Sequence, residues 1–297
     1  MRNVIVGLVS LSMVSAGVAD DWYTWRGPGG DGISQETGLN PAGASKVWET
    51  ELGEGYSSVS VKDGRLYTMG NKDGQDIVYC LNAETGQEIW TKSYSCKPGK
   101  FKGPRATPVV DGDHVYTVSR DGVLICFDAD SGRKTWETDL LDQTENDNSR
   151  WGIASSAVVC GELLILNVGD SGTAVEKSTG KIKWKSSGKQ SYASPVLFKR
   201  KSKTLAAIFS APGLHIVDAE TGKKAAEYAW KTKYDINGAD PLVMGETIFI
   251  SSGYDRECAL LDFSSGKLKK LWDSDIMKNQ FSSSIYVDGS IYGVDGQ

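Results

Sequence analysis

The chain has 297 residues, of which 39% are hydrophobic and 24% are charged. This composition is typical of a globular protein that buries a core, and it excludes a disordered chain. Thirty-eight acidic and 33 basic residues give a formal charge of −5. Because a nucleic-acid-binding protein needs lysines and arginines clustered on one face, we expect no nucleic-acid partner.

Residues 1–19 have the pattern of a secretory signal peptide. A basic residue precedes an apolar run over 4–14, and small residues at Gly17 and Ala19 suit cleavage. The run is too short for a membrane span, which needs ~18 or more apolar residues. The first cysteine is Cys80, so this region has no cysteine for lipid attachment. We expect a periplasmic or secreted mature protein without a stable membrane anchor.

Residues 20–45 form a leader that contains "WYTWRGPGGDGIS" at 22–34. Its glycine-rich part lacks the Gly-Lys-Ser/Thr ending of a phosphate-binding loop. We therefore interpret the leader as a turn-rich segment that precedes the folded domain at 46–297.

A short unit then recurs five times along the chain. Each copy has an alternating strand, a turn closed by glycine and, in most copies, a tryptophan soon after the turn. The first three copies carry Gly86 and Trp90, Gly132 and Trp136, and Gly180 and Trp184, and the last two turns close at Gly222 and Gly266. A period of ~40 to 50 residues made of short strands predicts a β-propeller with four strands per blade.

The second copy shows the expected blade most clearly. Its strands are predicted at 106–110, 114–119, 123–128 and 134–140, because apolar and polar residues alternate there without a helical period. In every copy the third strand has an apolar or small face, on which neighbouring blades would pack. A polar side chain four residues before the glycine would accept turn N–H groups, and the tryptophan would fill the seam between blades.

Both ends of the repeat region resemble parts of a blade. "VWETEL" at 47–52 matches 135–140, so we expect the chain to enter as a single fourth strand. Residues 282–297 supply the first two strands of a further blade. The sequence thus predicts an all-β propeller of five complete blades with partial blades at both ends. Because an open ring leaves unpaired strand edges, we expect six to eight blades in an intact protein.

The cysteines and histidines do not predict a metal or catalytic centre. Cys96 and Cys160 lie in connections on opposite faces of a propeller, so a disulfide between them would exceed the ~7 Å limit between Cα atoms. His114 and His215 lie in different blades without cysteine or acid at ligand spacing, which disfavours zinc and a Ser-His-Asp triad. The acidic stretch 140–148 lacks the glycine and distal Glu of a calcium loop, and we expect a solvated loop.

A candidate binding site comes from residues that do not repeat. The first strand of each blade lines the central channel, so the starts of these strands converge at one mouth. They deliver Tyr56, Arg105, Arg150, Trp151, Tyr192, Asn237, Asp240, Asn279 and Gln280. Arginines, aromatic rings and amides around a funnel suit an anionic or planar ligand, or a protein partner. Alternatively, these side chains satisfy the backbone ends of the inner strands.

The repeat, carried on "YCLNAETGQEIW", "ICFDADSGRKTW" and "HIVDAETGKK", resembles the pyrroloquinoline-quinone (PQQ)-type repeat of quinoprotein-like propellers. The leader resembles the segment before the propeller in exported members of this family. The resemblance implies a propeller fold, which enzymes and scaffolds share. It extends to the outer-membrane assembly propeller, whose lipid-anchored members begin with a lipidated cysteine.

The favoured hypothesis is an exported, non-catalytic propeller that binds a protein partner or small ligand at the channel mouth, without a cofactor. The alternative is a PQQ- and Ca²⁺-dependent dehydrogenase that oxidises alcohols or sugars, in which Arg105 and Arg150 would hold the quinone carboxylates. The resemblance implies an adjacent cysteine pair and a longer chain for such an enzyme. This sequence has no adjacent cysteines, and it offers no evident set of calcium ligands at the channel.

Overall fold

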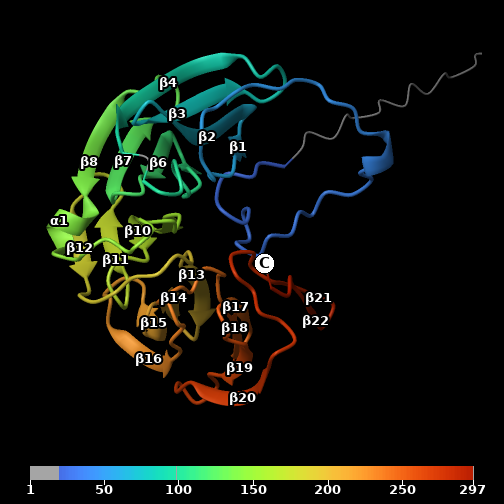
Figure 1. Cartoon of the computed structure of the whole chain (residues 1–297), viewed down its shortest axis with the longest axis vertical. Helices are drawn as coiled ribbons and strands as arrows, with labels where there is room; N and C mark the ends of the chain where they lie inside the picture. The colour runs from blue at the N-terminus through green and yellow to red at the C-terminus, as the bar shows by residue number, and fades with distance from the viewer. Residues whose placement is uncertain (1–19, 98, 297) are drawn as a thin grey trace, which may run out of the picture.

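The computed structural model describes residues 20–97 and 99–296. The predicted signal peptide lies outside these residues. The described chain forms five four-stranded antiparallel sheets and one two-stranded sheet, which are arranged as blades around a ring (Figure 1). The structure confirms the predicted β-propeller.

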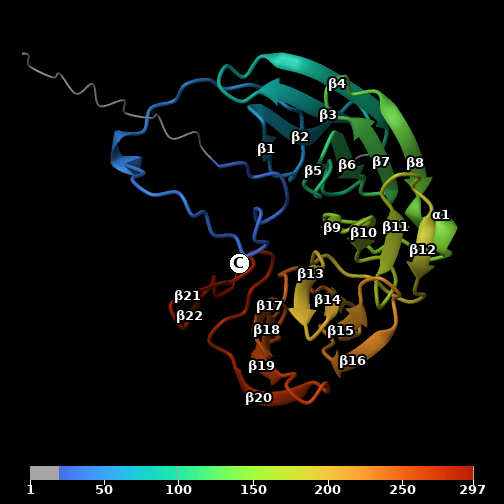
Figure 2. The same ribbon diagram turned by 180° about the vertical axis from the view of Figure 1, so that it is seen from behind.

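Each complete blade takes its strands in chain order, with the first strand at the channel and the fourth at the outer rim (Figure 2). Blade 1 contains β1 (Ser60–Lys62), β2 (Arg65–Lys72), β3 (Gln75–Asn82) and β4 (Glu88–Ser95). Blade 2 contains β5 (Val109–Asp111), β6 (His114–Val118), β7 (Val123–Asp128) and β8 (Lys134–Asp139). Blade 3 contains β9 (Val158–Cys160), β10 (Leu163–Leu166), β11 (Thr173–Glu176) and β12 (Ile182–Lys185).

Blade 4 contains β13 (Val196–Arg200), β14 (Lys203–Ser210), β15 (Gly213–Asp218) and β16 (Lys224–Ala229). Blade 5 contains β17 (Leu242–Met244), β18 (Thr247–Ser251), β19 (Cys258–Asp262) and β20 (Lys269–Ser274). The partial blade 6 contains β21 (Ile285–Val287) and β22 (Ser290–Tyr292). The only helices in the described residues are η1 (Pro41–Gly43) and α1 (Leu140–Thr144).

The predicted strands of blade 2 match the structure except at the channel. β7 has the predicted bounds, whereas β5 begins at Val109 instead of residue 106. The reason is that the N–H of Thr107 donates to the hydroxyl of Ser156 in blade 3, at 2.9 Å, and is not part of the ladder with β6. The start of the strand therefore joins two blades.

The hydrophobic core is divided among the seams between blades. Tyr67, Val78 and Cys80 of blade 1 are buried against Ile125 and Phe127 of blade 2 in one such cluster. Each following seam repeats this arrangement with its own cluster. Burial of apolar strand faces between blades is therefore the main stabilising contribution to the ring.

A tryptophan of one blade packs on the turn of the next. The indole N–H of Trp90 donates to the carbonyl of Ala129 at 2.9 Å, and its ring lies against Gly132. Trp48, Trp136 and Trp184 make the equivalent bonds to Ala83, Lys177 and Ala219. The turn glycines have φ between 66° and 80°, a region that favours glycine. Any Cβ at Gly132 would also lie 2.6 Å from the Trp90 ring.

This arrangement changes at the fourth and fifth blades. Ala226 pairs with Ile216 at the position that tryptophan holds in blades 1 to 3. Trp230 lies later in the chain and packs under Arg256, with the guanidinium 4.0 Å from its ring centre. Trp272 returns to the register position, opposite Leu260, but 42% of it is exposed.

The two partial blades differ from each other. β21 and β22 pair as expected at the C-terminal side. The expectation of a single strand at 47–52 is wrong, because these residues form no ladder with any described strand. Trp48 nevertheless packs on Gly86, as the tryptophan of a preceding fourth strand would do.

The leader lies across the open side of the ring, beside blade 6 (Figure 1). Trp22 forms a bridge with Val61 of blade 1, and the carbonyl of Tyr23 accepts from Val110 of blade 2 at 2.8 Å. Trp25 donates its indole N–H to Asp240 of blade 5 at 2.6 Å. Arg26 donates to the carbonyl of Ser284 beside blade 6 at 2.7 Å. The leader is thus part of the fold and connects the two ends of the ring.

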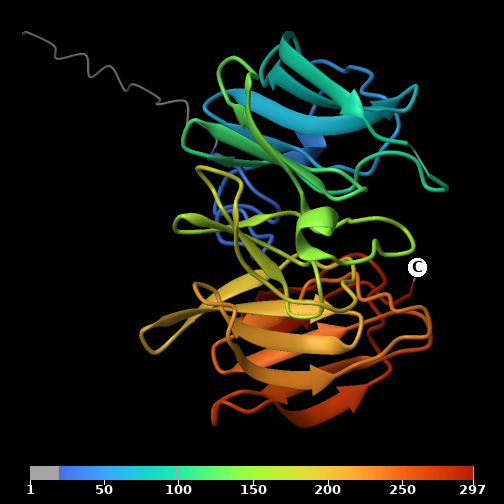
Figure 3. The same cartoon turned by 90° about the vertical axis from the view of Figure 1, so that its left-hand side faces the viewer.

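The acidic stretch 140–148 is not entirely loop. Its first part forms α1 on the outer rim, in view on the side that faces the viewer in Figure 3. Asp139 caps this helix by accepting from the N–H groups of Leu141 and Asp142, and Leu140 anchors it by burial.

Among the described residues, no helix is long and apolar enough to cross a membrane.

Candidate binding surface at the channel mouth

Five of the predicted site residues meet at one mouth of the channel. The guanidinium of Arg105 lies 5.8 Å from the ring centre of Tyr56, and that of Arg150 lies 4.8 Å from the Trp151 ring. The hydroxyl of Tyr192 accepts from the N–H of Trp151 at 3.3 Å. These contacts link the start of the first strand in blade 1 to that in blade 2, and the start in blade 3 to that in blade 4.

The connection between blades 1 and 2 adds residues that the sequence analysis missed. Phe101 packs edge-on against Trp151, with ring centres 5.1 Å apart. The ammonium of Lys100 lies 5.7 Å from the Trp151 ring, and Arg105 donates to the carbonyl of Phe101 at 2.9 Å. These residues lie in a non-repeating loop, where the only signal was an aromatic residue between lysines, in "KFK" at 100–102.

Further aromatic residues come from blades 4 to 6. Tyr234 packs edge-on against Tyr254 with ring centres 5.5 Å apart, and Gln280 donates to the Tyr254 hydroxyl at 2.8 Å. We define the mouth surface as Tyr56, Lys100, Phe101, Arg105, Arg150, Trp151, Tyr192, Tyr234, Tyr254 and Phe281. Tyr56 and Phe281 are 62% and 59% exposed, and Phe101 and Tyr234 also rank among the exposed large side chains. Exposed apolar groups that gather in this way mark an interaction surface.

Burial changes the titration of two residues at the mouth. It is the main cause of the lowered pKa of Arg105, and the nearby charge of Arg120 lowers that pKa further. Burial also raises the pKa of the Tyr192 hydroxyl, so this phenol is neutral at physiological pH. One guanidinium nitrogen of Arg105 is buried without a hydrogen-bond partner in the described residues.

Three other predicted site residues lie in the interior. Asn237 donates to the carbonyl of Ser210 and accepts from the hydroxyl of Ser252, both at 2.7 Å. Asn279 donates to the carbonyl of Ser282 at 2.7 Å. Asp240 accepts from Trp25 and from the N–H of Ser194 at 2.7 Å. Their hydrogen bonds match the alternative interpretation, in which the side chains satisfy backbone groups of the inner strands, so we leave them out of the mouth surface.

Asp240 is one member of a series of bonds that joins the inner strands. Ser156 accepts from Thr107 and its own N–H donates to Ser194, while the N–H of Asp240 donates to Ser283. Each bond connects one blade to the next. This series holds the strand starts, and therefore the mouth residues next to them, in fixed positions.

The mouth surface offers no evident set of ligands for calcium. Within 20–97 and 99–296, no group of three or more His, Cys, Asp or Glu side chains could hold a metal ion. All five cysteines lie in these ranges and are free, and none is adjacent to another. The charged groups of the mouth surface are cationic, whereas Ca²⁺ requires oxygen ligands.

Comparison with solved structures shows the fold. Quinohemoprotein alcohol dehydrogenase from Comamonas testosteroni superimposes with a TM-score of 0.59 at 15% identity, covering 92% of this chain and 52% of that one. A europium-containing methanol dehydrogenase gives 0.58 at 12% identity, covering 79% and 64%. At such identities the likeness concerns the propeller and not its chemistry.

Comparison of sequences identifies the family. Residues 37–187 and 75–297 match the family model for outer membrane protein assembly factor BamB. The BamB of Yersinia pestis is 24% identical over 281 residues, which covers 86% of this chain and 67% of that protein. The BamB of Escherichia coli is 30% identical over 102 residues, 31% of this chain and 25% of that protein. The expected periplasmic location agrees with these relatives, and the chain belongs to the family of outer membrane protein assembly factor BamB.

Proposed function

We propose that this protein is a non-catalytic propeller of the periplasm that holds a protein partner at its mouth surface, as a scaffold in outer-membrane assembly. Its relatives are named as assembly factors and not as enzymes. The observation that carries the proposal is the cluster of exposed aromatic side chains with unpaired cations around one end of the channel.

The chemistry of the mouth surface suits a protein partner. Tyrosine, tryptophan and arginine dominate the binding energy of protein interfaces because they bury large areas and keep a polar group. Arg150 and Lys100 have no acidic side chain within 4.0 Å among the described residues, so both are available to a partner's carboxylates. A small planar anion would use the same groups, and the experiment below separates the two.

The rigidity of the surface supports the same proposal. The mouth residues belong to consecutive blades, which the inner-strand hydrogen bonds hold in place. A surface that is already ordered before binding loses less conformational entropy when the partner docks.

Photo-cross-linking tests this proposal. A benzophenone amino acid at Tyr56 or Phe281 should cross-link to a protein of the cell envelope, because both side chains are exposed at the mouth. The matched control is Glu220, which is exposed in a turn at the opposite face and should not cross-link to that protein. Equal cross-linking at Glu220, or none at the mouth, would contradict the proposal; loss of the adduct with Arg150→Glu would support it.

An assay of quinone chemistry tests the enzyme alternative. Titration of the intact protein with PQQ and Ca²⁺ should show no saturable binding, and a dye-linked assay with alcohols or sugars should show no turnover. Saturable quinone binding together with turnover would refute the non-catalytic function.

A further inference from the structure

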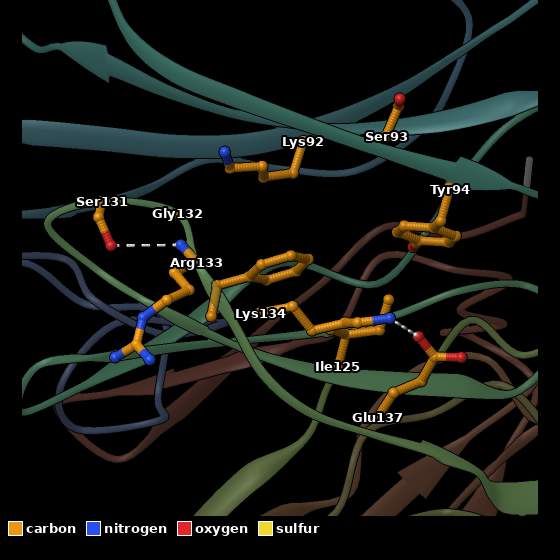
Figure 4. Close-up of a pocket in the computed structure, with 10 residues that line it drawn as sticks. Lys92, Ser93, Tyr94, Ile125, Ser131, Gly132, Arg133, Lys134 and Glu137 are labelled. Carbon is orange, nitrogen blue, oxygen red and sulfur yellow. Dashed lines mark hydrogen bonds and ion pairs between the residues drawn. The ribbon is translucent and has the colours of Figure 1, made fainter.

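A groove opens at the outer rim between blades 1 and 2, and Tyr94 lies toward one end of it (Figure 4). Its base is closed to a ligand, because Ile125 and Phe127 are only 1% and 3% exposed. A different pocket lies inside the ring, between leader residues 23–30 and the first strands β5, β9 and β13 of blades 2 to 4. We call it the channel pocket. Its volume of about 290 Å³ suits a ligand at the small end of the usual range of ~300 to 1,000 Å³.

The leader binds the wall of the channel in the way that an added strand would. Trp22 and Val61 of β1 exchange two backbone hydrogen bonds, at 2.8 and 2.9 Å. The carbonyl of Tyr23 accepts from the N–H of Val110 in β5 at 2.8 Å. Val61 and Val110 each lie next to the residue that closes the hairpin with the second strand. A residue at this position of an antiparallel pair turns its N–H and C=O groups away from the second strand, and here they face the channel.

Val159 in β9 and Leu197 in β13 hold the same position as Val110. Val159 also lies next to the residue that closes its hairpin, and it is three residues after Ser156. Leu197 is three residues after Ser194, the next member of the series of bonds that joins the inner strands. Within 20–97 and 99–296, no hydrogen bond reaches the channel-facing N–H and C=O groups of Val159 or Leu197. Two neighbouring strands therefore present main-chain donors and acceptors beside the pocket.

The leader leaves these two strands unpaired because it turns away after Tyr23. The N–H of Gly27 donates to the carbonyl of Thr24 at 3.0 Å, which closes a tight turn. Gly27 has a φ of 75°, and a Cβ there would lie 2.6 Å from the ring of Trp22, so the turn requires glycine. The indole of Trp25 then reaches across to blade 5. The channel pocket is the space between this turn and the edges of β9 and β13.

The other groups that line the channel pocket favour a neutral ligand, because its charged side chains are already bonded. Asp111 pairs with Lys177 at 2.6 Å. Both carboxylate oxygens of Asp240 accept hydrogen bonds, and Arg26 donates to two carbonyl groups. The apolar walls are partly exposed at Val158, Val159, Val196 and Leu197. A peptide backbone with small apolar side chains matches both the main-chain groups and these walls.

We propose that the channel pocket binds a free short peptide in extended conformation. The N–H and C=O groups of the peptide pair with those of Val159, the next position around the channel after Val110, as Trp22 pairs with Val61. Its small apolar side chains pack on the exposed parts of the wall. Main-chain hydrogen bonds supply the affinity in this mode of recognition. The channel pocket shares no residue with the mouth surface, so the proposal does not rest on the proposed function.

Titration with the capped tripeptide acetyl-Ala-Val-Ala-amide tests the proposal, with amide NMR shifts of the intact, isotope-labelled protein as the measurement. The shifts of Val159 and Leu197 should saturate, whereas those of Trp151 at the mouth and Trp272 at the outer rim should not change. The same tripeptide with every residue N-methylated should bind about tenfold more weakly, because these residues can no longer donate main-chain hydrogen bonds.

A proline in the channel wall tests the position of the peptide. Val159→Pro removes the channel-facing N–H and leaves the ladder with β10 intact, so it should weaken binding of the tripeptide about tenfold. The wall accepts proline, since Pro195 and Pro241 precede β13 and β17 by one residue. Val243→Pro is the equivalent change in β17, outside the pocket, and as the matched control it should leave binding unchanged.

Three results would overturn the proposal. They are unsaturable shifts at Val159, equal binding of the N-methylated and the unmodified tripeptide, and equal binding by Val159→Pro and Val243→Pro. Circular dichroism should show that both variants keep the β-sheet content of the native protein. If Val159→Pro does not fold, the comparison of the two tripeptides on the native protein still decides the outcome.

Discussion

Trp90 and Trp272 hold the same place in the repeat but have different surroundings. Each pairs across the sheet with an apolar residue of the third strand, Cys80 or Leu260. Trp90 is 7% exposed because its ring lies against Gly132 of the next blade, whereas Trp272 is largely open to solvent. The contribution of this tryptophan to the stability of the fold therefore depends on its packing against the neighbouring blade and not on its own strand.

Replacement of Trp90 by Ala should lower the free energy of unfolding by about 3–5 kcal/mol, because it leaves a cavity in the seam and removes the bond to Ala129. Trp272→Ala is the matched control and should cost less than ~1 kcal/mol, as expected of an exposed site. Urea unfolding followed by circular dichroism measures both. Equal losses of unfolding free energy in the two variants would contradict the claim that packing in the seam between blades determines how much the tryptophan stabilises the protein.

Asp240 should make the protein less stable as the pH rises. Burial raises its pKa above the ordinary value of 3.8, although Arg26, Trp25 and Ser194 favour the charged form. The folded state therefore binds the proton more tightly than the unfolded state, so wild-type stability falls between pH 3.8 and the raised pKa. Relative to wild type, Asp240→Asn should gain stability across this window in urea titrations from pH 4 to 7.

Asp128 provides a control whose effect on stability should change with pH in the opposite direction. Hydrogen bonds from the side chain and backbone of Ser131 lower the pKa of the Asp128 carboxyl below 3.8. The contribution of Asp128 to stability is therefore fully present above pH 3.8 and is lost as the pH falls through the lowered pKa. Asp128→Asn should therefore approach wild-type stability only in acid. If the stabilities of Asp240→Asn and Asp128→Asn, relative to wild type, changed with pH in the same direction, the opposite pKa shifts of the two carboxyl groups would be refuted.

At the scale of elements, the leader shows what sequence patterns cannot reveal. Hairpins such as β7–β8 were predictable because their alternation, turn residues and glycine are local. The docking of Trp25 on Asp240 joins residues 215 positions apart, and nothing in "WYTWRGPGG" indicates that contact. The helix α1 was missed for a related reason, since burial of Leu140 against the blades stabilises a helix that is too short to form alone.

Loss of the leader contacts should loosen one part of the ring selectively. Arg26→Ala removes the bond to Ser284 and should increase amide hydrogen exchange in β21 and β22. Exchange in β10 and β11 should stay at the wild-type rate, because the backbone bonds of the leader in the described part of the chain go to blades 1 and 2 and not to these strands. A uniform increase across all blades would instead indicate global destabilisation and would contradict a local closing role.

At the scale of the whole molecule, the repeat determines where the variable residues lie. Once the turn glycines set the register, the sequence places Arg105, Trp151 and Tyr192 at the starts of first strands, and the structure brings them to one mouth. The sequence could not place Phe101, which lies in the connection between blades 1 and 2, or Tyr254, which lies in the turn between β18 and β19, because these segments do not match their counterparts in the other blades. Nor could it show that Asp240 turns inward, because that depends on partners in three other segments.

The central claim is that a partner protein binds at the mouth surface, and calorimetric titration tests it most directly. The protein that cross-links at Tyr56 should be titrated into the wild type, Trp151→Ala and the control Trp272→Ala. We predict an affinity at least about tenfold weaker for Trp151→Ala, as for an interface residue that carries much of the binding energy, and an unchanged affinity for Trp272→Ala. Wild-type affinity in Trp151→Ala would contradict the proposed function.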